Sequence, residues 1–311
     1  METEMATLEK AAASSADTSS STDGPTMTRG PLRLLVGYDG GTGSRDALSF
    51  AKALCEKTEV ELTVASVRPY WPGPLGAERF ATAIKEDEHW IDRGTCEVLG
   101  SIPFATRVIA GGHEAAGLKE LAEAEDSDLI VVGSTHRGRI GSVFPGSVGG
   151  HVLDGAPCAV AIAPRGLSDS DFSIQTIAVG YDGSKASATA LHLAVGLTER
   201  TDASLLILGA VEISLGLAGF ETRQPKGFQQ AQMERHLQRA LESVPPTVPA
   251  ESRLLFGEPA EMIVGTTSEV DLLILGSRGS YDLIPRLMLG SVGAAVVKGA
   301  TSPTLITPTD S

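Results

Sequence analysis

The chain has 311 residues, a hydrophobic fraction of 42% and a formal net charge of −14 at pH 7. The length predicts about two domains, and the acidic balance excludes a general nucleic-acid binder, which needs a basic face. No apolar run approaches the roughly 20 residues of a membrane span, and the acidic N-terminus lacks a signal-type apolar core, so we expect a cytoplasmic protein. The three cysteines include no C-x-x-C pair and are expected to be buried thiols.

Strands and helices alternate along the first half of the chain. Residues 1–30 are rich in Ser, Thr and Ala, lack hydrophobic periodicity and are expected to form a disordered tail. From the spacing of apolar residues we predict strands over 32–37, 60–67, 104–109, 129–132 and 159–163, and helices over 44–57, 77–99, 114–124 and 147–153. We therefore expect a first domain over residues 31–164, followed by a polar linker over residues 165–173.

The second half repeats this pattern. We predict strands over 174–179, 204–211, 253–256, 272–275 and 304–307, and helices over 185–200, 229–243 and after Pro259 and Ser291. Asp182 lies 143 residues after Asp39, and Gly276 lies 143 residues after Gly133. A single offset through most of a half indicates a duplicated domain rather than a short solenoid repeat, so we expect a second domain over residues 174–308.

The alternation predicts an α/β protein with two tandem Rossmann-like domains, each a five-stranded parallel sheet flanked by helices. Ligands of such sheets bind beyond the carboxyl ends of the strands, where the strand order reverses. Asp39 follows the first predicted strand and Gly133 follows the fourth. If those two strands are neighbours, Asp39 and the loop after Gly133 face one crevice.

A glycine- and arginine-bearing loop follows the fourth strand of each half. In the stretch DLIVVGSTHRGRIGSVFPGS, residues 128–147, an apolar run ends at Gly133, and Gly146 with Ser147 opens a helix. Free N–H groups and a partial positive charge at a helix start favour an anion, and glycine lets the backbone approach a phosphate closely. The stretch DLLILGSRGSYDLIPRLMLGS repeats this arrangement with Gly276, Gly279, Gly290 and Ser291.

Together with the turn VGYDG, which occurs once in each half, these loops resemble those of the universal stress protein family. That family carries a G-x2-G-x9-G-[S/T] nucleotide loop on a five-stranded sheet of the adenine nucleotide alpha hydrolase-like type. The resemblance spans about residues 32–308 and implies ATP, with or without Mg²⁺, as the ligand. In the ATP-binding branch, loop amides and the final hydroxyl hold the phosphates, the Asp lies beside the nucleotide, and the end of the second strand contacts adenine. The site residues implied by position are Asp39, Val67, Gly133, Gly146 and Ser147, and Asp182, Val211, Gly276, Gly279, Gly290 and Ser291.

Two features depart from the family pattern. His136 stands at the second glycine, where its ring can occupy phosphate space or donate to a phosphate when protonated. The second-half spacer before Gly290 holds ten residues instead of nine, which can shift Gly290 relative to Gly276. His136 and Arg137 join the candidate site of the first half. Four loop arginines can clamp phosphate oxygens or remain solvated, namely Arg137, Arg139, Arg278 and Arg286.

Several polar residues near the sites have a structural alternative. Asp39 and Asp182 can bind ribose or a metal, or can stabilise the turn or cap the following helix. The other candidate helix caps are Thr42, Ser44, Ser147, Ser184 and Ser291.

Single-domain members of the family look like dimers across their last strand, an edge that otherwise stays unpaired. We therefore expect residues 159–163 to pair with residues 304–307 in an intramolecular pseudo-dimer, and leave homodimerisation open.

Rival functions lack their motifs. The chain has no G-K-[S/T] of a P-loop, no G-x-G-x-x-G after the first strand and no G-x-S-x-G of a serine hydrolase. Two hypotheses remain. The chain is either a nucleotide-binding, non-catalytic stress-response module with at most slow ATP hydrolysis, or a ligand-free structural or interaction module that kept the fold. The sequence determines neither the nucleotide, nor the number of binding sites, nor the downstream partner.

Overall fold

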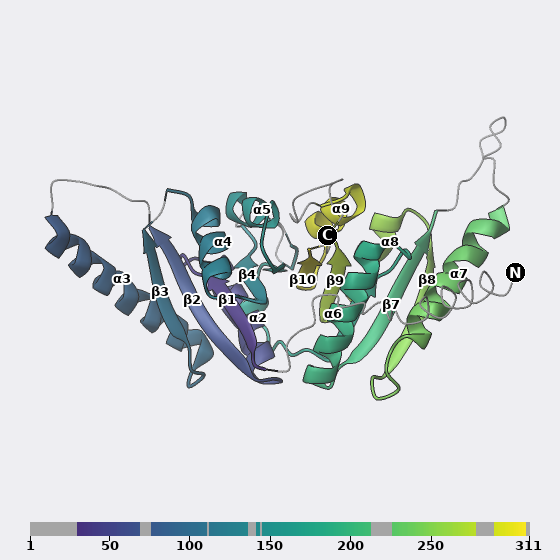
Figure 1. The fold of residues 1–311 in the computed structure, drawn as a ribbon, viewed down its shortest axis with the longest axis horizontal. Coiled ribbons are helices and arrows are strands. Elements are labelled where there is room, and N and C mark those ends of the chain that lie inside the picture. The colour runs from purple at the N-terminus through teal and green to yellow at the C-terminus, as the bar shows by residue number, and fades with distance from the viewer. Residues whose placement is uncertain are drawn as a thin grey trace, which may run out of the picture.

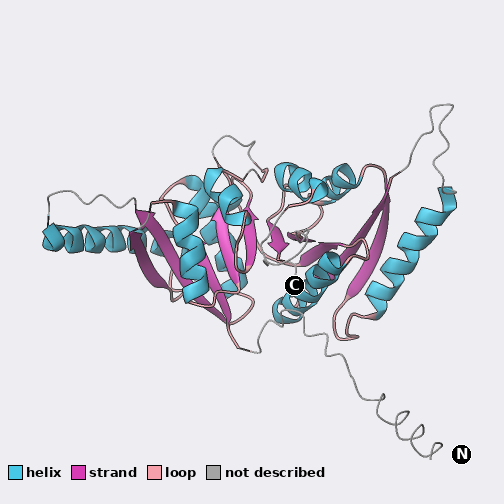
Figure 2. Ribbon diagram, turned by 45° about the horizontal axis from the view of Figure 1, so that its top comes forward, coloured by secondary structure: helices cyan, strands magenta, loops and turns pink. Residues whose placement is uncertain are grey.

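The computed structural model describes residues 30–68, 76–110, 112–135, 141–143, 145–212, 226–277 and 289–308. In this part of the chain ten strands form one sheet with helices on both faces (Figures 1 and 2). The predicted α/β class is confirmed. The predicted tail, apart from Gly30, lies outside the described residues.

The first half contains five strands and their connecting helices. In chain order these are β1 Leu32–Gly37, α2 Thr42–Cys55, β2 Val60–Arg68, α3 Gly76–Leu99, β3 Ala105–Ala110, α4 Glu114–Ala124, β4 Leu129–Gly133, α5 Ser147–Leu153 and β5 Ala159–Ala163. A single 3₁₀ turn, η1 Leu167–Asp169, lies within the predicted linker.

The second half repeats the same elements. They are β6 Thr176–Gly180, α6 Lys185–Thr201, β7 Ser204–Val211, α7 Lys226–Glu242, β8 Ala250–Phe256, α8 Pro259–Thr266, β9 Leu272–Gly276, α9 Ser291–Gly299 and β10 Thr304–Thr307. Every predicted strand and helix is present, and the differences lie at the ends. The strand predicted over 253–256 begins earlier, at Ala250, because Ala250 is already in register with Leu205 of β7.

The strand order is β3-β2-β1-β4-β5-β10-β9-β6-β7-β8. Strands within each half run parallel, and β1 lies between β2 and β4 as the crevice prediction requires. At the centre, β10 pairs antiparallel with β5 through Leu305 and Ala161 and the residues beside them. The strand pairing expected between the two halves is therefore present, and it joins two parallel sheets into one.

Each face of the sheet has its own hydrophobic core. One core packs the strands against α2, α3, α6 and α7, and the other packs them against α4, α5, α8 and α9. Successive strand residues alternate between the two cores: Val131 lies in the first, and Ile130 and Val132 in the second. Because both faces are covered, the strands read as continuous apolar runs in the sequence.

Two of the predicted site glycines are required by packing. A Cβ on Gly133 would lie 1.8 Å from the carbonyl oxygen of Gly43, and one on Gly276 would lie 2.3 Å from that of Ala186. The first turns of α2 and α6 therefore rest directly on the ends of β4 and β9. Gly133 and Gly276 have a structural reason that is independent of any ligand.

The loop between β4 and α5 reaches the other half. The N–H of Val143 donates to the carbonyl oxygen of Ala300, the C-terminal cap of α9, at 2.7 Å. The Val143 side chain is fully buried in the core that α5 and α9 share. Gly141 and Ser142 exchange backbone hydrogen bonds with Arg165 at the start of the linker. This loop thus packs against both the second half and the linker.

The three cysteines agree only in part with the prediction that their thiols are buried. Burial raises the pKa of Cys55 to about 11 and that of Cys158 to about 12, so both stay protonated at neutral pH. Cys96 is exposed on α3, contrary to the prediction, because its position in the helix faces solvent.

A buried carboxylate holds the linker. Asp46 on α2 is fully buried, and it accepts hydrogen bonds from the N–H of Gly166 at 2.9 Å and from the N–H and hydroxyl of Ser168 at 2.8 and 2.7 Å. These bonds satisfy both carboxylate oxygens and fix η1 against α2. The counterpart of Asp46 in the second half is Thr189, which bonds only within its own helix, to the carbonyl oxygen of Lys185.

Asp46→Ala should lower the free energy of unfolding by about 2–3 kcal/mol, because it removes a buried carboxylate and its three hydrogen bonds to the linker. Thr189→Ala is the matched control and should cost clearly less, since no tertiary bond is lost. Urea unfolding followed by circular dichroism measures both. Equal losses for the two variants would contradict the anchoring role of Asp46.

Candidate functional site

Each half has a cavity at the carboxyl ends of its two central strands. The first-half cavity, called site 1, has a volume of about 350 Å³ and lies beyond β1 and β4. It is lined by residues including Tyr38, Asp39, Ser44, Ser66, Val67, Glu114, Leu118, Gly133, Ser134, Thr135, Gly146 and Ser147. Its position is the reversal point of strand order, where ligands of such sheets bind.

The second-half cavity, called site 2, lies beyond β6 and β9 and has a volume of about 710 Å³. Its lining includes Tyr181, Asp182, Ser184, Lys185, Ser187, Ala210, Pro259, Ile263, Gly276, Gly290, Val292 and Gly293. Both volumes fall within the roughly 300–1,000 Å³ typical of small-molecule sites.

Site 1 brings together five of the seven residues predicted for it. Asp39, Val67, Gly133, Gly146 and Ser147 all line the cavity. The other two, His136 and Arg137, lie outside the described residues. The crevice expected between the first-strand Asp and the fourth-strand loop is therefore present.

Site 2 brings together Asp182, Gly276 and Gly290, so the longer spacer does not separate the two glycines. Gly279 lies outside the described residues. Ser291 is exposed and does not line the cavity, although Gly290 and Val292 on either side of it do.

Val211 was assigned to the wrong strand position. Gly37 is in register with Ala65, and Gly180 with Leu208, so the counterpart of Val67 is Ala210. Ala210 lines site 2 and Val211 does not. In a strand a shift of one residue turns the side chain to the opposite face, which is why the error matters.

The helices that close the two sites begin in the same way. Gly146 precedes α5 with φ −70° and ψ −170°, and Gly290 precedes α9 with φ −68° and ψ 170°. Neither helix has a side-chain cap. Ser147 and Ser291 are the first helical residues and do not cap, because the cap position is taken by the glycine. First-turn N–H groups without a side-chain acceptor can donate to an anion.

The two turn aspartates stabilise their turns. Asp39 Oδ1 accepts the N–H of Gly41 at 2.8 Å, and Asp182 Oδ1 accepts the N–H of Ser184 at 2.9 Å. Neither aspartate caps a helix, so the capping alternative is wrong for both.

Of the helices for which a side-chain cap was predicted, only α6 has the predicted cap. Ser184 accepts the N–H of Ser187 at 3.2 Å, as predicted. The first half differs because α2 begins after Gly41, which places Thr42 and Ser44 inside the helix. There the Ser44 hydroxyl donates to the carbonyl oxygen of Gly41 at 2.9 Å.

Sequence reasoning missed Glu114, Thr135 and Lys185. Glu114 and Lys185 each begin a helix that follows a strand end, and that position is the signal that could have found them. Thr135 follows β4 by two residues, and its buried hydroxyl oxygen has no hydrogen-bond partner among the residues that the structure describes. An unsatisfied buried hydroxyl in a cavity lining can be satisfied by a ligand.

Asp182 is held in its charged form. Partial burial, the largest influence, would by itself raise the pKa of this carboxyl, but hydrogen bonds from Ser184 and Ser187 together hold the pKa below its ordinary value. A carboxylate with a lowered folded-state pKa stabilises the fold above its unfolded pKa, and this contribution is lost as the pH falls through the folded pKa.

Asp182→Asn should therefore destabilise the chain at pH 7, and the difference from wild type should shrink as the pH falls below about 4. Urea unfolding of both proteins between pH 7 and about pH 3 checks this. Ser187→Ala removes a hydroxyl that helps to lower the pKa of Asp182 and should show a smaller effect of the same sign in its pH dependence. A difference that stays constant with pH would contradict the assignment.

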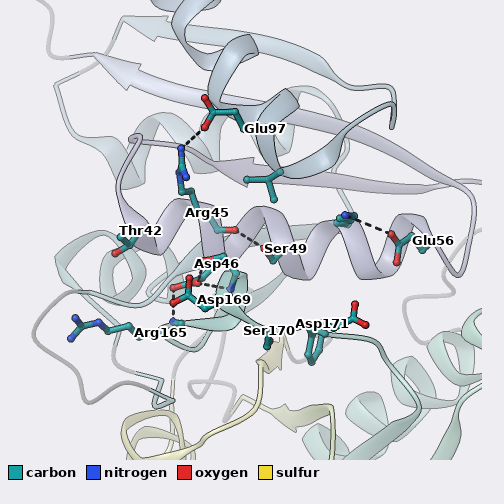
Figure 3. Close-up of a pocket in the computed structure, with 15 residues that line it drawn as sticks. Thr42, Arg45, Asp46, Ser49, Glu56, Glu97, Arg165, Asp169, Ser170 and Asp171 are labelled. Atoms are coloured by element: carbon teal, nitrogen blue, oxygen red, sulfur yellow. Dashed lines mark hydrogen bonds and ion pairs between the residues drawn. The ribbon is translucent and has the colours of Figure 1, made fainter.

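A third cavity, of about 480 Å³, lies between α2 and the linker, away from the strand ends (Figure 3). Its charges are largely paired: Arg45 contacts Glu97 at 2.5 Å and Lys52 contacts Glu56 at 4.0 Å. The one polar side chain drawn there that is fully buried, Asp46, is satisfied by the linker. This cavity is explained by the packing of the linker on α2.

A model of the universal stress protein family matches residues 32–164 and again residues 173–308. The chain belongs to the universal stress protein family. Its two matched segments make it a tandem member, as the duplicated loops and VGYDG turns indicated. A curated universal stress protein of Mycobacterium tuberculosis is 25% identical over 300 residues, which cover 88% of this chain and 96% of the relative.

Two solved structures were compared with this chain. The crystal structure of a universal stress protein from Archaeoglobus fulgidus covers 89% of this chain and 98% of that protein, with a TM-score of 0.66 and 17% identity, and has the same fold. A universal stress protein in complex with cAMP is 28% identical and matches 44% of this chain and 98% of its own length, with a TM-score of 0.35. None of the helices in the described part of the chain has the length and apolarity needed to cross a bilayer.

Proposed function

We propose that this universal stress protein binds adenine nucleotide at sites 1 and 2 and acts as a non-catalytic regulatory module. The observation that supports this most is the repeated geometry. In both halves a turn aspartate, the end of the fourth strand and an uncapped helix start line one cavity. In both halves the first-turn N–H groups at this helix start have no side-chain acceptor and can donate to an anionic ligand.

The residues of site 1 fit a nucleotide in three ways. First-turn N–H groups of α5 can donate to phosphate oxygens. The Thr135 hydroxyl, buried without a partner, can bond a polar ligand atom. Val67 at the end of β2 offers an apolar surface for the base, and Asp39, at the end of β1, has a second carboxylate oxygen for the ribose.

Site 2 offers a turn aspartate, an apolar residue near the end of the second strand and a helix start, with Ala210 in place of Val67 and Asp182 in place of Asp39. ATP, with or without Mg²⁺, is the expected ligand, and the two halves act as a covalently joined pair. Bound nucleotide would change the relative free energies of conformations that a partner distinguishes, which is the general way a non-catalytic ligand regulates.

ATP with Mg²⁺ should raise the melting temperature. A ligand at 100 times its Kd adds about 2.7 kcal/mol of stability per site. Differential scanning fluorimetry with ATP, and with GTP as the control, measures the shift. Mass spectrometry of protein purified without added nucleotide should also detect a copurified adenine nucleotide. The absence of any shift at millimolar ATP would favour the ligand-free module instead.

A matched pair of glycine variants tests the loop end of site 1. A Cβ on Gly146 would lie 2.0 Å from the Thr135 methyl, whereas one on Gly150 of the same helix would meet nothing within 4 Å. Gly146→Ala should weaken ATP binding at site 1 about tenfold, equivalent to about 1.4 kcal/mol. Gly150→Ala should leave it unchanged. Isothermal titration calorimetry compares the two, and unchanged binding by Gly146→Ala would show that the ligand does not contact this helix start.

A further inference from the structure

The two sites share a backbone but differ in charge at equivalent positions. Leu118 of α4 lies beneath Gly37, and Ile263 of α8 lies beneath Gly180, so these two side chains are counterparts. Four residues before them, Glu114 begins α4 and Pro259 begins α8. Each of these first residues lines its own site. Site 1 therefore has a carboxylate where site 2 has a proline ring.

A second charge difference, of opposite sign, occurs at the first residues of α2 and α6. Lys185 begins α6 and lines site 2. Its counterpart Thr42 begins α2 and borders the linker cavity instead of site 1. Among the described residues that line the two cavities, the charged ones are Asp39 and Glu114 in site 1, and Asp182 and Lys185 in site 2. Within the described lining, site 2 alone combines its aspartate with a cation.

The fold does not explain Lys185. A cation in the first turn of a helix is opposed by the helix dipole, which favours cations in the last turn. The Lys185 side chain is exposed and forms no ion pair with the described part of the chain. Glu114 is the reverse case, because an acid in the first turn of α4 is stabilising. The helix dipole disfavours a lysine at this position, and no ion pair with the described residues compensates for it. Such a residue indicates an interaction with a ligand.

We infer that Lys185 makes site 2 selective for nucleotides with two or three phosphates over a nucleoside monophosphate. The inference rests on the proposed function, because it assigns the ligand class of the same cavity. Lys185 lines site 2 together with Gly290 at the start of α9, the proposed phosphate end of the site, so that additional phosphates of a bound nucleotide can meet its ammonium group. Each added phosphate charge strengthens that attraction. At site 1 the Glu114 carboxylate repels the same charges.

The test measures AMP and ATP affinity by isothermal titration calorimetry in EDTA, so that no divalent cation screens the phosphates. The measurements are made in a chain that carries Gly146→Ala, because this variant should bind nucleotide weakly at site 1 and leave site 2 as the tighter site. In this chain Lys185→Thr introduces the residue type found at the equivalent position of the first half, Thr42. It should reduce the ratio of ATP to AMP affinity about threefold to tenfold. Lys185→Arg keeps the charge and should retain the ratio.

Thermal unfolding without nucleotide separates a ligand role from a structural one. Lys185→Thr should leave the melting temperature unchanged or raise it, because an unfavourable charge at the helix start is removed. Lys298→Thr is the matched control: it makes the same change in the last turn of α9, outside the lining of both sites. It should leave the affinity ratio unchanged and should not raise the melting temperature.

The outcomes distinguish this inference from the proposed function. If nucleotide binds but Lys185→Thr does not change the ratio, or Lys298→Thr lowers it equally, the selectivity of Lys185 is refuted and nucleotide binding stands. If neither AMP nor ATP binds the wild-type chain, both proposals fail together.

Discussion

The pairing of β5 with β10 is the contact on which the whole architecture depends. Each of these strands ends a parallel sheet, and an unpaired strand edge buried between two hydrophobic layers would leave its backbone groups unsatisfied. Pairing them antiparallel removes both edges and makes one sheet of ten strands. It also makes each core continuous across the centre, since the clusters on both faces contain residues of both halves.

The pairing of β5 with β10 places the β4–α5 loop, whose ends line site 1, against α9, whose first turn lines site 2. Val143, in the β4–α5 loop of the first half, is buried and bonded to Ala300 at the end of α9. The first turn of α9 lines site 2, and the ends of the β4–α5 loop line site 1. The two cavities are thus parts of one packed unit. The linker adds to it through Asp46, a contact that the second half does not repeat.

Duplication kept the backbone of the sites and changed their side chains. Gly146 and Gly290 start their helices with nearly the same dihedral angles, despite a spacer that differs by one residue. The charged cavity residues Glu114 and Lys185 have uncharged counterparts in the other half, Pro259 and Thr42. Main-chain donors are therefore alike in the two halves, while the residues at the helix starts differ in charge. Two unequal sites in one chain can respond to different ligands or concentrations.

The sequence by itself determined the elements and the duplication, because strands covered on both faces leave long apolar runs and a repeat leaves a constant offset. The strand pairing at the centre was expected from the resemblance to the family's dimers. It also identified Asp39, Gly133, Gly146 and Asp182, since turn and loop glycines mark strand ends. Only the tertiary structure decided the rest. Register assigned Ala210 instead of Val211, because a one-residue shift reverses a strand side chain. Packing showed that Gly133 is required by the carbonyl oxygen of Gly43. The sequence marks Glu114 and Lys185 as first residues of helices that follow strands, but only the tertiary structure shows that these helix starts line the cavities.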